Sequence, residues 1–349
     1  MSFEAYKADL SNRYEISHAI SVQVTAHYNG IGKVTLYLPA DDYNINAIDR
    51  GGILYDTERG YTWTLQDVVY DTVDNIIIAH GYTCNWLLDK RCITTKRTVT
   101  DPAADVYATV SENLRGLPGV TVSEAAVVAD AAAEAEEAVL YGGQLMEECI
   151  KVLDTAELGH RMVWDDATRT HTFEIYQGRD LTTGIHAVVF SELQGTATNL
   201  VMTLDDSTFK NYFYIPCKNK GSTGTEADFV FEYGAEEATD RREYWRHAIE
   251  SQNTDETEAE FKQRLKWLCI EEEESRLRRQ SFEVLIDPEE FGVLYDLGDK
   301  VVCVSERLGV TFESRITGIS YTMDATGEET KIELGEPKLT AIGEAMLKR

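Results

Sequence analysis

Arg179 and Asp180 are the residues whose types and spacing first suggest chemistry. They stand between two glycines in "YQGRDLTTG", where a guanidinium and a carboxylate could bind a substrate or move a proton. The alternative is a structural clasp, in which Gly178 gives backbone freedom and the Asp180 side chain accepts hydrogen bonds from nearby amides. We expect the clasp, because a strand must turn sharply at this position.

Two histidines next to a predicted hairpin offer a second candidate site. His160 and His171 flank the hairpin, and Asp165 and Asp166 stand at its tip over residues 165–169. These residue types can bind a metal ion. Polar residues at a hairpin tip are also the ordinary composition of a turn, so we expect no metal site there.

The remaining motifs of catalysis are absent from the sequence. The glutamates at 271–274 suggest paired carboxylates of the glycosidase kind, but they fall on a predicted helix face, where charge is typical of a solvated surface. The sequence contains neither HExxH nor Gly-x-Ser-x-Gly, and "YNGIG" and "GRDLTTG" lack the lysine of a phosphate-binding loop. We therefore predict no catalytic residue, no metal and no cofactor.

The six cysteines are scattered and form no CxxC motif. Such spacing is typical of reduced thiols that are mostly buried in a protein made in a cytoplasm. They are Cys84, Cys92, Cys149, Cys217, Cys269 and Cys303.

The charge balance excludes a conventional nucleic-acid binder. The 349 residues include 33 basic and 61 acidic ones, a net charge of −28, which repels polyphosphate. Two explanations of this acidic excess stay open. One is solubility or a salty habitat, and the other is a surface along which nucleic acid passes without binding. Aromatic and basic residues alternate in "DRREYWRH" (240–247), which we interpret as the edge of a strand or helix rather than a platform for bases.

No membrane span is predicted, because no stretch reaches 18 consecutive apolar residues. The first residues also lack the basic start and apolar run of a signal peptide. We expect a soluble globular protein that is made in a cytoplasm.

The elements that must position these residues are mostly strands. Alternating apolar and polar residues over 20–29 and 33–40 predict a hairpin around Asn29 and Gly30, and 52–71 and 75–88 continue the pattern. A hairpin follows over 161–178. Further strands are predicted over 200–219, 228–234, 282–287, 295–306, 310–324 and 328–336, with turns at 308–309 and 325–328.

Helices are predicted between the two strand-rich ends. Asp101 is expected to cap a helix over 101–117 with Pro102 as its first residue. The alanine-rich segment over 123–139, which Ser123 could cap, is interpreted either as a loosely docked helix or as a mobile loop. A third helix lies within 142–159 and is expected to end at Gly159, with Leu145, Cys149, Val152 and Leu153 at helical spacing.

The predicted fold class is α+β, with two antiparallel β-barrel-like domains and α/β insertions. Residues 1–95 form the N-terminal barrel-like domain, and 96–209 an α/β middle domain with helices and a hairpin. Residues 210–349 contain strands, a long helix over 255–280 and the C-terminal barrel-like domain.

Three segments together resemble the tail-hub, or baseplate hub, proteins of siphophages. The central one is "FEIYQGRDLTTG…VVFSELQGTATNL…KNYFYIPC", with a Tyr-x-Gly-x-Asp-x-Thr corner, a Phe-Ser pair and an Asn-Leu step; Leu181 and Thr182 stand where that family often has Arg-Thr. The matching residues are Tyr176, Gly178, Asp180, Thr182, Phe190, Ser191, Asn199, Leu200 and Asn211.

The two flanking segments resemble the first and last domains of that family in the right order. In the N-terminal part, a strand ends at Gly81 and leads to a Leu-Leu-x-x-Arg turn that ends at Arg91. In the C-terminal part, Gly298 and Asp299 open a strand, and Arg315 begins the next.

The resemblance implies a structural virion protein of the tail tip. It implies a homotrimer whose barrel-like domains alternate in a ring that continues the tail tube, and whose lumen DNA crosses without specific binding. Expected partners are the distal tail protein, the tape measure protein and the tip or receptor-binding proteins. Because the sequence stops at Arg349, soon after its last predicted strand, we expect no lytic domain and a separate adaptor role.

Two other classes of function stay open. One is a cell-wall-degrading enzyme on a β-rich scaffold, which would clear purified cell walls. The other is a carbohydrate- or receptor-binding module, for which exposed aromatic residues in long loops would be expected.

Overall fold

The chain divides into two compact units, each described here by itself. The first combines Met1–Val201 with Phe282–Arg349, and the second is Met202–Ser281. The computed structural model describes residues 2–123, 139–220, 226–234, 240–253, 256–276, 279–287, 289–307, 309–335 and 338–339. The predicted domain borders after residues 95 and 209 stay a prediction.

The first unit opens with strands whose side chains alternate between core and solvent. Val22 and Val24 of β3 are buried, and β4 pairs with β3 in antiparallel register with Val34 opposite Val24, which confirms the predicted hairpin. The elements of this part are β1 (Phe3–Tyr6), β2 (Arg13–Ile16), β3 (Ser21–His27), β4 (Lys33–Pro39), α1 (Asp42–Ala47), β5 (Ile53–Asp56), β6 (Thr62–Asp71), β7 (Ile76–Thr83) and the 3₁₀ helix η1 (Cys84–Lys90).

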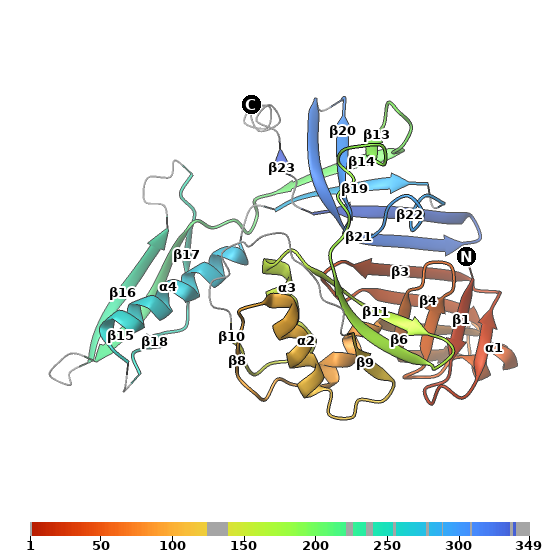
Figure 1. The fold of residues 1–349 in the computed structure, drawn as a ribbon, viewed down its shortest axis with the longest axis horizontal. Coiled ribbons are helices and arrows are strands. Elements are labelled where there is room, and N and C mark those ends of the chain that lie inside the picture. Colours follow the sequence, from red (N-terminus) through yellow and green to blue (C-terminus); the bar gives the residue numbers. More distant parts are fainter. Residues whose placement is uncertain are drawn as a thin grey trace. The chain divides into compact units, whose positions relative to one another are not determined.

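The C-terminal strands join these strands in one sheet, as Figure 1 shows. Strand β21 pairs with β3, with Tyr321 opposite Val24. Within the described residues this sheet has 14 strands. Their order is β14-β19-β22-β21-β3-β4-β7-β6-β5-β1-β2, β20 and β23 also pair with β21, and β13 pairs with β20. The added strands are β13 (Val189–Ser191), β14 (Asn199–Asp205), β19 (Arg279–Ile286), β20 (Lys300–Ser305), β21 (Val310–Asp324), β22 (Gly327–Leu334) and β23 (Lys338–Leu339).

The two predicted barrels are not confirmed, because this sheet is open and is shared by both ends of the chain. Strand β21 is the reason. Its first part pairs with β20, its second part pairs with β22 and β3, and the register shifts between Ile316 and Gly318. A bulge of this kind bends a strand, so the two parts of β21 can pair with different sets of strands. The fold is mostly β-sheet, with 45% strand and 17% helix, rather than an even α+β mixture.

A helical layer and a second hairpin complete the first unit. Asp101 accepts a hydrogen bond from the Ala104 amide at 3.1 Å and Pro102 begins the helix, so the predicted cap is confirmed. The elements are β8 (Arg97–Thr98), α2 (Pro102–Asn113), β9 (Val120–Val122), β10 (Val139–Leu140), α3 (Leu145–Thr155), β11 (Gly159–Asp165) and β12 (Thr170–Tyr176). Residues 124–138 of the predicted alanine-rich segment lie outside the described ones.

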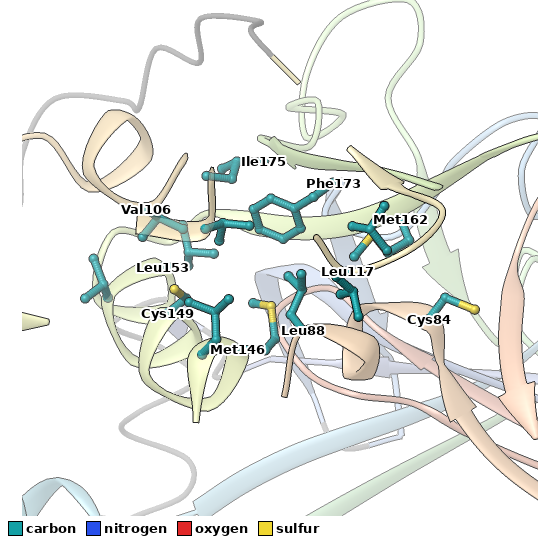
Figure 2. Packing of buried hydrophobic residues seen from close by; sticks show 14 of the residues in the cluster. Cys84, Leu88, Val106, Leu117, Met146, Cys149, Leu153, Met162, Phe173 and Ile175 are labelled. Carbon is teal, nitrogen blue, oxygen red and sulfur yellow. The ribbon is translucent and has the colours of Figure 1, made fainter. Parts of the chain in front are cut away.

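The core of this layer lies between α2, α3, η1 and the β11–β12 hairpin. Leu88 and Leu117 lie close to Phe173 and Met162, with Leu153 of α3 on the other side of the ring (Figure 2). The apolar residues of α3 that recur at helical spacing are all buried, which confirms that prediction.

Helix α3 ends earlier than the sequence predicts. Its last residue is Thr155, and Glu157 has a φ of 53°, so the chain turns there. Gly159 begins β11 instead of ending the helix. A left-handed residue stops a helix whether or not it is glycine.

The second unit is a small sheet covered by one long helix. Its elements are β15 (Tyr212–Lys220), β16 (Glu226–Gly234), β17 (Glu243–Trp245), β18 (Glu250–Ser251) and α4 (Glu258–Glu274). Phe213 and Ile215 of β15 pack with Phe261, Leu265 and Cys269 of α4. Apolar residues on alternate strand positions thus meet one stripe of the helix.

Helix α4 is shorter than the predicted 255–280. A capping box sets its start: the Glu260 amide donates to the Thr257 hydroxyl at 3.3 Å, and the Thr257 amide donates to the Glu260 carboxylate at 2.8 Å. The helix ends at Glu274, and its last turn consists of glutamates, which are unfavourable at the negative end of the helix dipole. Arg279, which the prediction placed in the helix, begins β19.

The cysteines are free thiols, and every one except Cys92 is buried, as predicted. Burial raises the pKa of the Cys84 thiol to about 12, which makes that group a poor nucleophile at neutral pH. Within the described residues, no helix is long and apolar enough to cross a membrane.

We predict that two buried histidines destabilise the fold in acid. Burial lowers the pKa of His160 and of His171 from 6.5 to about 4. The unfolded chain therefore binds protons that the folded chain does not as the pH falls from about 6.5 to 4, and each histidine lowers the free energy of unfolding by about 1.4 kcal/mol per pH unit.

Urea unfolding of the wild type and of His160→Gln and His171→Gln at several pH values measures this effect. Buried carboxyls such as Asp56, whose pKa is raised by burial, act in the opposite direction, so the comparison is between variants. Each substitution should make the fall in stability toward pH 4 shallower. An unchanged slope in both variants would contradict the prediction.

Candidate functional site

Asp299 and Arg179 form the centre of a structural clasp in the first unit. The Asp299 side chain is 3% exposed. Its carboxylate accepts the Arg179 amide at 2.7 Å, the Asp296 amide at 2.9 Å and the Arg179 guanidinium through both Nε and Nη2. A buried carboxylate with this many donors is fully satisfied, and removing it would leave donors unpaired.

Backbone hydrogen bonds extend the clasp to three chain segments. The Lys300 amide donates to the Arg179 carbonyl at 2.8 Å, and the Leu181 amide donates to the Lys300 carbonyl at 2.9 Å. The Ile316 amide donates to the Asp299 carbonyl at 2.9 Å. We use "the clasp" for Arg179, Asp299 and the backbone of 178–181, 296–300 and 315–316.

Gly178 is required by close approach rather than by an unusual backbone angle. Its φ is outside the left-handed region, whereas a Cβ at this position would overlap the Gly298 carbonyl. Gly298 has a φ of 89° and faces the Tyr28 ring, so it needs glycine on both counts. The sequence argument that Gly178 provides turning freedom is therefore corrected.

Tyr28 connects the clasp to the rest of the core. Its ring is buried and lies where a Cβ on Gly159 or Gly298 would overlap it. Its hydroxyl lies 3.1 Å from the Glu157 carbonyl and 3.2 Å from the Tyr176 carbonyl. The Arg315 guanidinium lies 5.3 Å from the ring centre, within cation–π range.

Asp180 stabilises the next turn and is not the partner of Arg179. Its carboxylate accepts the Thr182 amide at 3.0 Å and the Thr182 hydroxyl at 2.7 Å, and these bonds lower its pKa. The hydrogen bond to Asp299 is the main reason that the pKa of Arg179 is raised. Arg179 and Asp180 thus have different partners: Arg179 binds Asp299, and Asp180 binds Thr182.

The Phe-Ser pair lies beside the clasp in the same sheet. Strand β13 runs parallel to β20, with Phe190 opposite Cys303. Phe190 packs edge-on against Tyr295, with ring centres 5.0 Å apart. The Ser191 hydroxyl donates to Glu306 at 2.8 Å, which ties the end of β13 to the end of β20.

Three of the predicted site residues lie in other elements and do not belong to the clasp. Gly81 is in β7, where a Cβ would overlap the Thr64 carbonyl. The Arg91 guanidinium donates to the Leu114 carbonyl at 3.0 Å, beyond the last turn of α2. Asn199 is exposed at the start of β14.

The sequence did not single out Tyr28 or Asp296, and it named Asp299 without pairing it with Arg179. No motif marks Tyr28, since its role depends on two glycines that are distant in sequence. Asp296, in "YDLGD", stands three residues before Asp299, and its amide is one of the donors to the clasp carboxylate. That short spacing was the available signal.

The described residues hold no cluster of three or more potential metal ligands. His160 lies 3.0 Å from the Asn85 amide nitrogen, and His171 lies 3.1 Å from the Thr62 hydroxyl. Asp166, at the hairpin tip, accepts a hydrogen bond from the Tyr6 hydroxyl at 2.6 Å. The histidines and the tip carboxylates thus have separate partners.

We predict that Asp299→Ala costs about 2–4 kcal/mol of stability, because it leaves the amides of Arg179 and Asp296 without an acceptor. The matched control is Asp180→Ala, which removes hydrogen bonds at an exposed turn and should cost about 1 kcal/mol. Denaturant unfolding measures both. Equal losses of stability in the two variants would contradict a central role of Asp299 in the clasp.

We also predict that Gly178→Ala destabilises the fold more than Gly184→Ala. The first substitution forces the clasp backbone apart. The second places a side chain in open space and adds only the strain of a φ of 88°, about 1 kcal/mol. Thermal unfolding measures the difference, and a Gly178→Ala variant with the wild-type melting temperature would contradict the close approach.

The fold is similar to that of solved phage tail proteins. The prophage MuSo2 43 kDa tail protein from Shewanella oneidensis is 13% identical, with a TM-score of 0.57 over 99% of this chain and 100% of that chain. A tail protein from Neisseria meningitidis MC58 is 10% identical, with a TM-score of 0.54 over 96% of each chain. Prophage tail protein gp18 from Listeria monocytogenes EGD-e is 14% identical, with a TM-score of 0.51 over 100% and 98%.

The sequence itself matches a family model. The identities of 10–14% to the solved structures show a shared fold alone. A search of the curated proteins finds no match. The model for Siphovirus ReqiPepy6 Gp37-like protein, in contrast, matches residues 3–336, which confirms the resemblance to siphophage proteins. The chain belongs to the Siphovirus ReqiPepy6 Gp37-like family and has the fold of prophage tail proteins.

Proposed function

We propose that this protein is a structural component of a phage tail, and that it forms the trimeric hub of the tail tip. The observation that carries this proposal is the family match, which extends over residues 3–336 of the chain. The similar folds of the prophage tail proteins from Listeria and Shewanella support it. The protein acts as a non-enzymatic adaptor in the virion, between the distal tail protein above and the tip components below.

The clasp supports assembly because it joins two loops that carry exposed apolar side chains. One loop follows Asp180 and carries Ile185, which is 95% exposed. Leu193, which is 80% exposed, lies just after β13. The other loop precedes Asp299 and carries Val293, which is 74% exposed. Apolar side chains this exposed favour contact with a second copy of the chain or with another tail protein.

DNA passage without adhesion requires a surface that is poor in cations. The net charge of −28 gives the chain as a whole this property. The central strands β3, β4 and β7 contain neither Asp nor Glu, and Lys33 is the one Lys or Arg among them. A path along the solvent face of these strands would therefore offer DNA little positive charge to bind.

The mass of the protein in solution tests the hub. Light scattering should give three times the chain mass, and negative-stain images should show a threefold ring with a central hole. A monomer at all concentrations would contradict the trimer.

An interface variant sharpens the same experiment. Val293→Asp with Ile185→Asp places charges on the apolar loops and should give a folded monomer with an unchanged circular dichroism spectrum. The control is Val73→Asp, at a residue that is 90% exposed on the turn between β6 and β7, and it should stay trimeric. Loss of the trimer in both variants, or in neither, would exclude these loops as the interface.

A further inference from the structure

A cavity of about 260 Å³ lies inside the first unit, separate from the apolar loops of the proposed interface. Residues of β3, β6 and β11, the end of β7 and the segment before Gly298 contribute to its wall. Gly60, Arg161 and Val163 belong to the wall and are exposed, so the cavity is accessible from solvent.

His160 supplies a buried hydrogen-bond donor to this wall. The Asn85 side chain is oriented by Thr83, whose hydroxyl donates to its oxygen, and its nitrogen donates to the Gly30 carbonyl at 3.1 Å. The same nitrogen lies 3.0 Å from His160 Nδ1, and acceptance of this bond by Nδ1 places the proton of the neutral ring on Nε2. His160 is 2% exposed, and its Nε2 has no hydrogen-bond partner in the described part of the chain. Because Nε2 has less than 1 Å² of accessible surface, a ligand reaches it only when the side chains around it move apart slightly.

Tyr176 and Asp296 add polar groups to the same cavity. Oδ1 of Asp296 accepts the Leu297 amide at 2.7 Å and the Tyr61 hydroxyl at 3.3 Å. Between the described residues, no hydrogen bond engages Oδ2 of Asp296 or the hydroxyl of Tyr176. The clasp fixes this part of the wall, because the Asp296 amide donates to Asp299.

The cations of the wall already have carboxylate partners. Arg59 lies 2.6 Å from Glu328 and 3.8 Å from Asp56. Arg161 lies 3.0 Å from Glu174. A ligand that carries a net negative charge would therefore find no uncompensated cation here, and the wall favours a neutral ligand.

The apolar part of the wall argues against a cavity that holds water alone. Ala26, Met162 and Leu297 line it together with the rings of Tyr61 and Tyr176. The volume would hold roughly nine water molecules, each of which needs two to four polar partners, and these side chains provide few. A molecule with apolar C–H faces and hydroxyl edges matches both kinds of wall.

We propose that this cavity binds one neutral sugar ring, either as a free monosaccharide or as the end of a glycan. The His160 Nε2–H donates to a sugar oxygen. The Tyr176 hydroxyl and Asp296 Oδ2 bond to sugar hydroxyls, and a tyrosine ring packs against the C–H face.

Nuclear magnetic resonance of the full chain tests the proposal. The imidazole ¹⁵N resonances of His160 are followed while D-glucose, D-galactose, N-acetyl-D-glucosamine and a chitin trisaccharide are each added to about 50 mM, well above a millimolar Kd. At least one sugar should shift the Nε2 resonance in a saturable way, and glycerol should not. A trisaccharide that binds more tightly than its monosaccharide identifies a glycan end, and the reverse identifies a free sugar.

Two variants separate binding from folding. Tyr176→Phe removes only a hydroxyl that the fold does not use, so the melting temperature should stay the same while the affinity falls about 2- to 10-fold. Tyr141→Phe, at a residue 64% exposed and outside the cavity wall, should bind as the wild type does. The proposal is overturned if no sugar shifts His160, if glycerol shifts it equally, or if both variants keep the wild-type affinity.

Discussion

The hydrogen-bonded carboxylate of Asp299 is the interaction on which the arrangement of the first unit depends. Strands from both ends of the chain share one sheet, and their connections must be held where the sheet bends. Asp299 does this with one buried side chain that accepts two backbone amides and the Arg179 guanidinium. Because the carboxylate is buried, each of these bonds is expensive to lose.

Local chemistry in the sequence was sufficient to predict most individual elements. Asp101 followed by Pro102 marks the start of α2, and the buried residues of α3 recur at helical spacing. Helix ends were less predictable. Helix α3 stops before Glu157, which takes a left-handed conformation that glutamate does not favour. The shared sheet could not be predicted, because the pairing of β21 with β3 depends on contacts between residues almost 300 positions apart.

The clasp shows how far motif reasoning extends to a site. The turn chemistry of Asp180 follows from its short-range bonds to Thr182, and the sequence suggests it correctly. Arg179 pairs with Asp299, which is 120 positions away, and no local pattern in the sequence indicates that pairing. Gly178 and Gly298 are both needed, for reasons of space that only the packed backbone reveals. A structural purpose for these residues agrees with the proposed function as a tail component.

The clasp should belong to the most stable core of the first unit, and native-state hydrogen exchange measures this directly. The amides of Arg179, Leu181 and Lys300 should exchange only by global unfolding, with opening free energies within about 1 kcal/mol of the value from denaturant unfolding. Exchange of these amides through a local opening several kcal/mol below the global value would show that the clasp is a mobile loop contact and contradict the account.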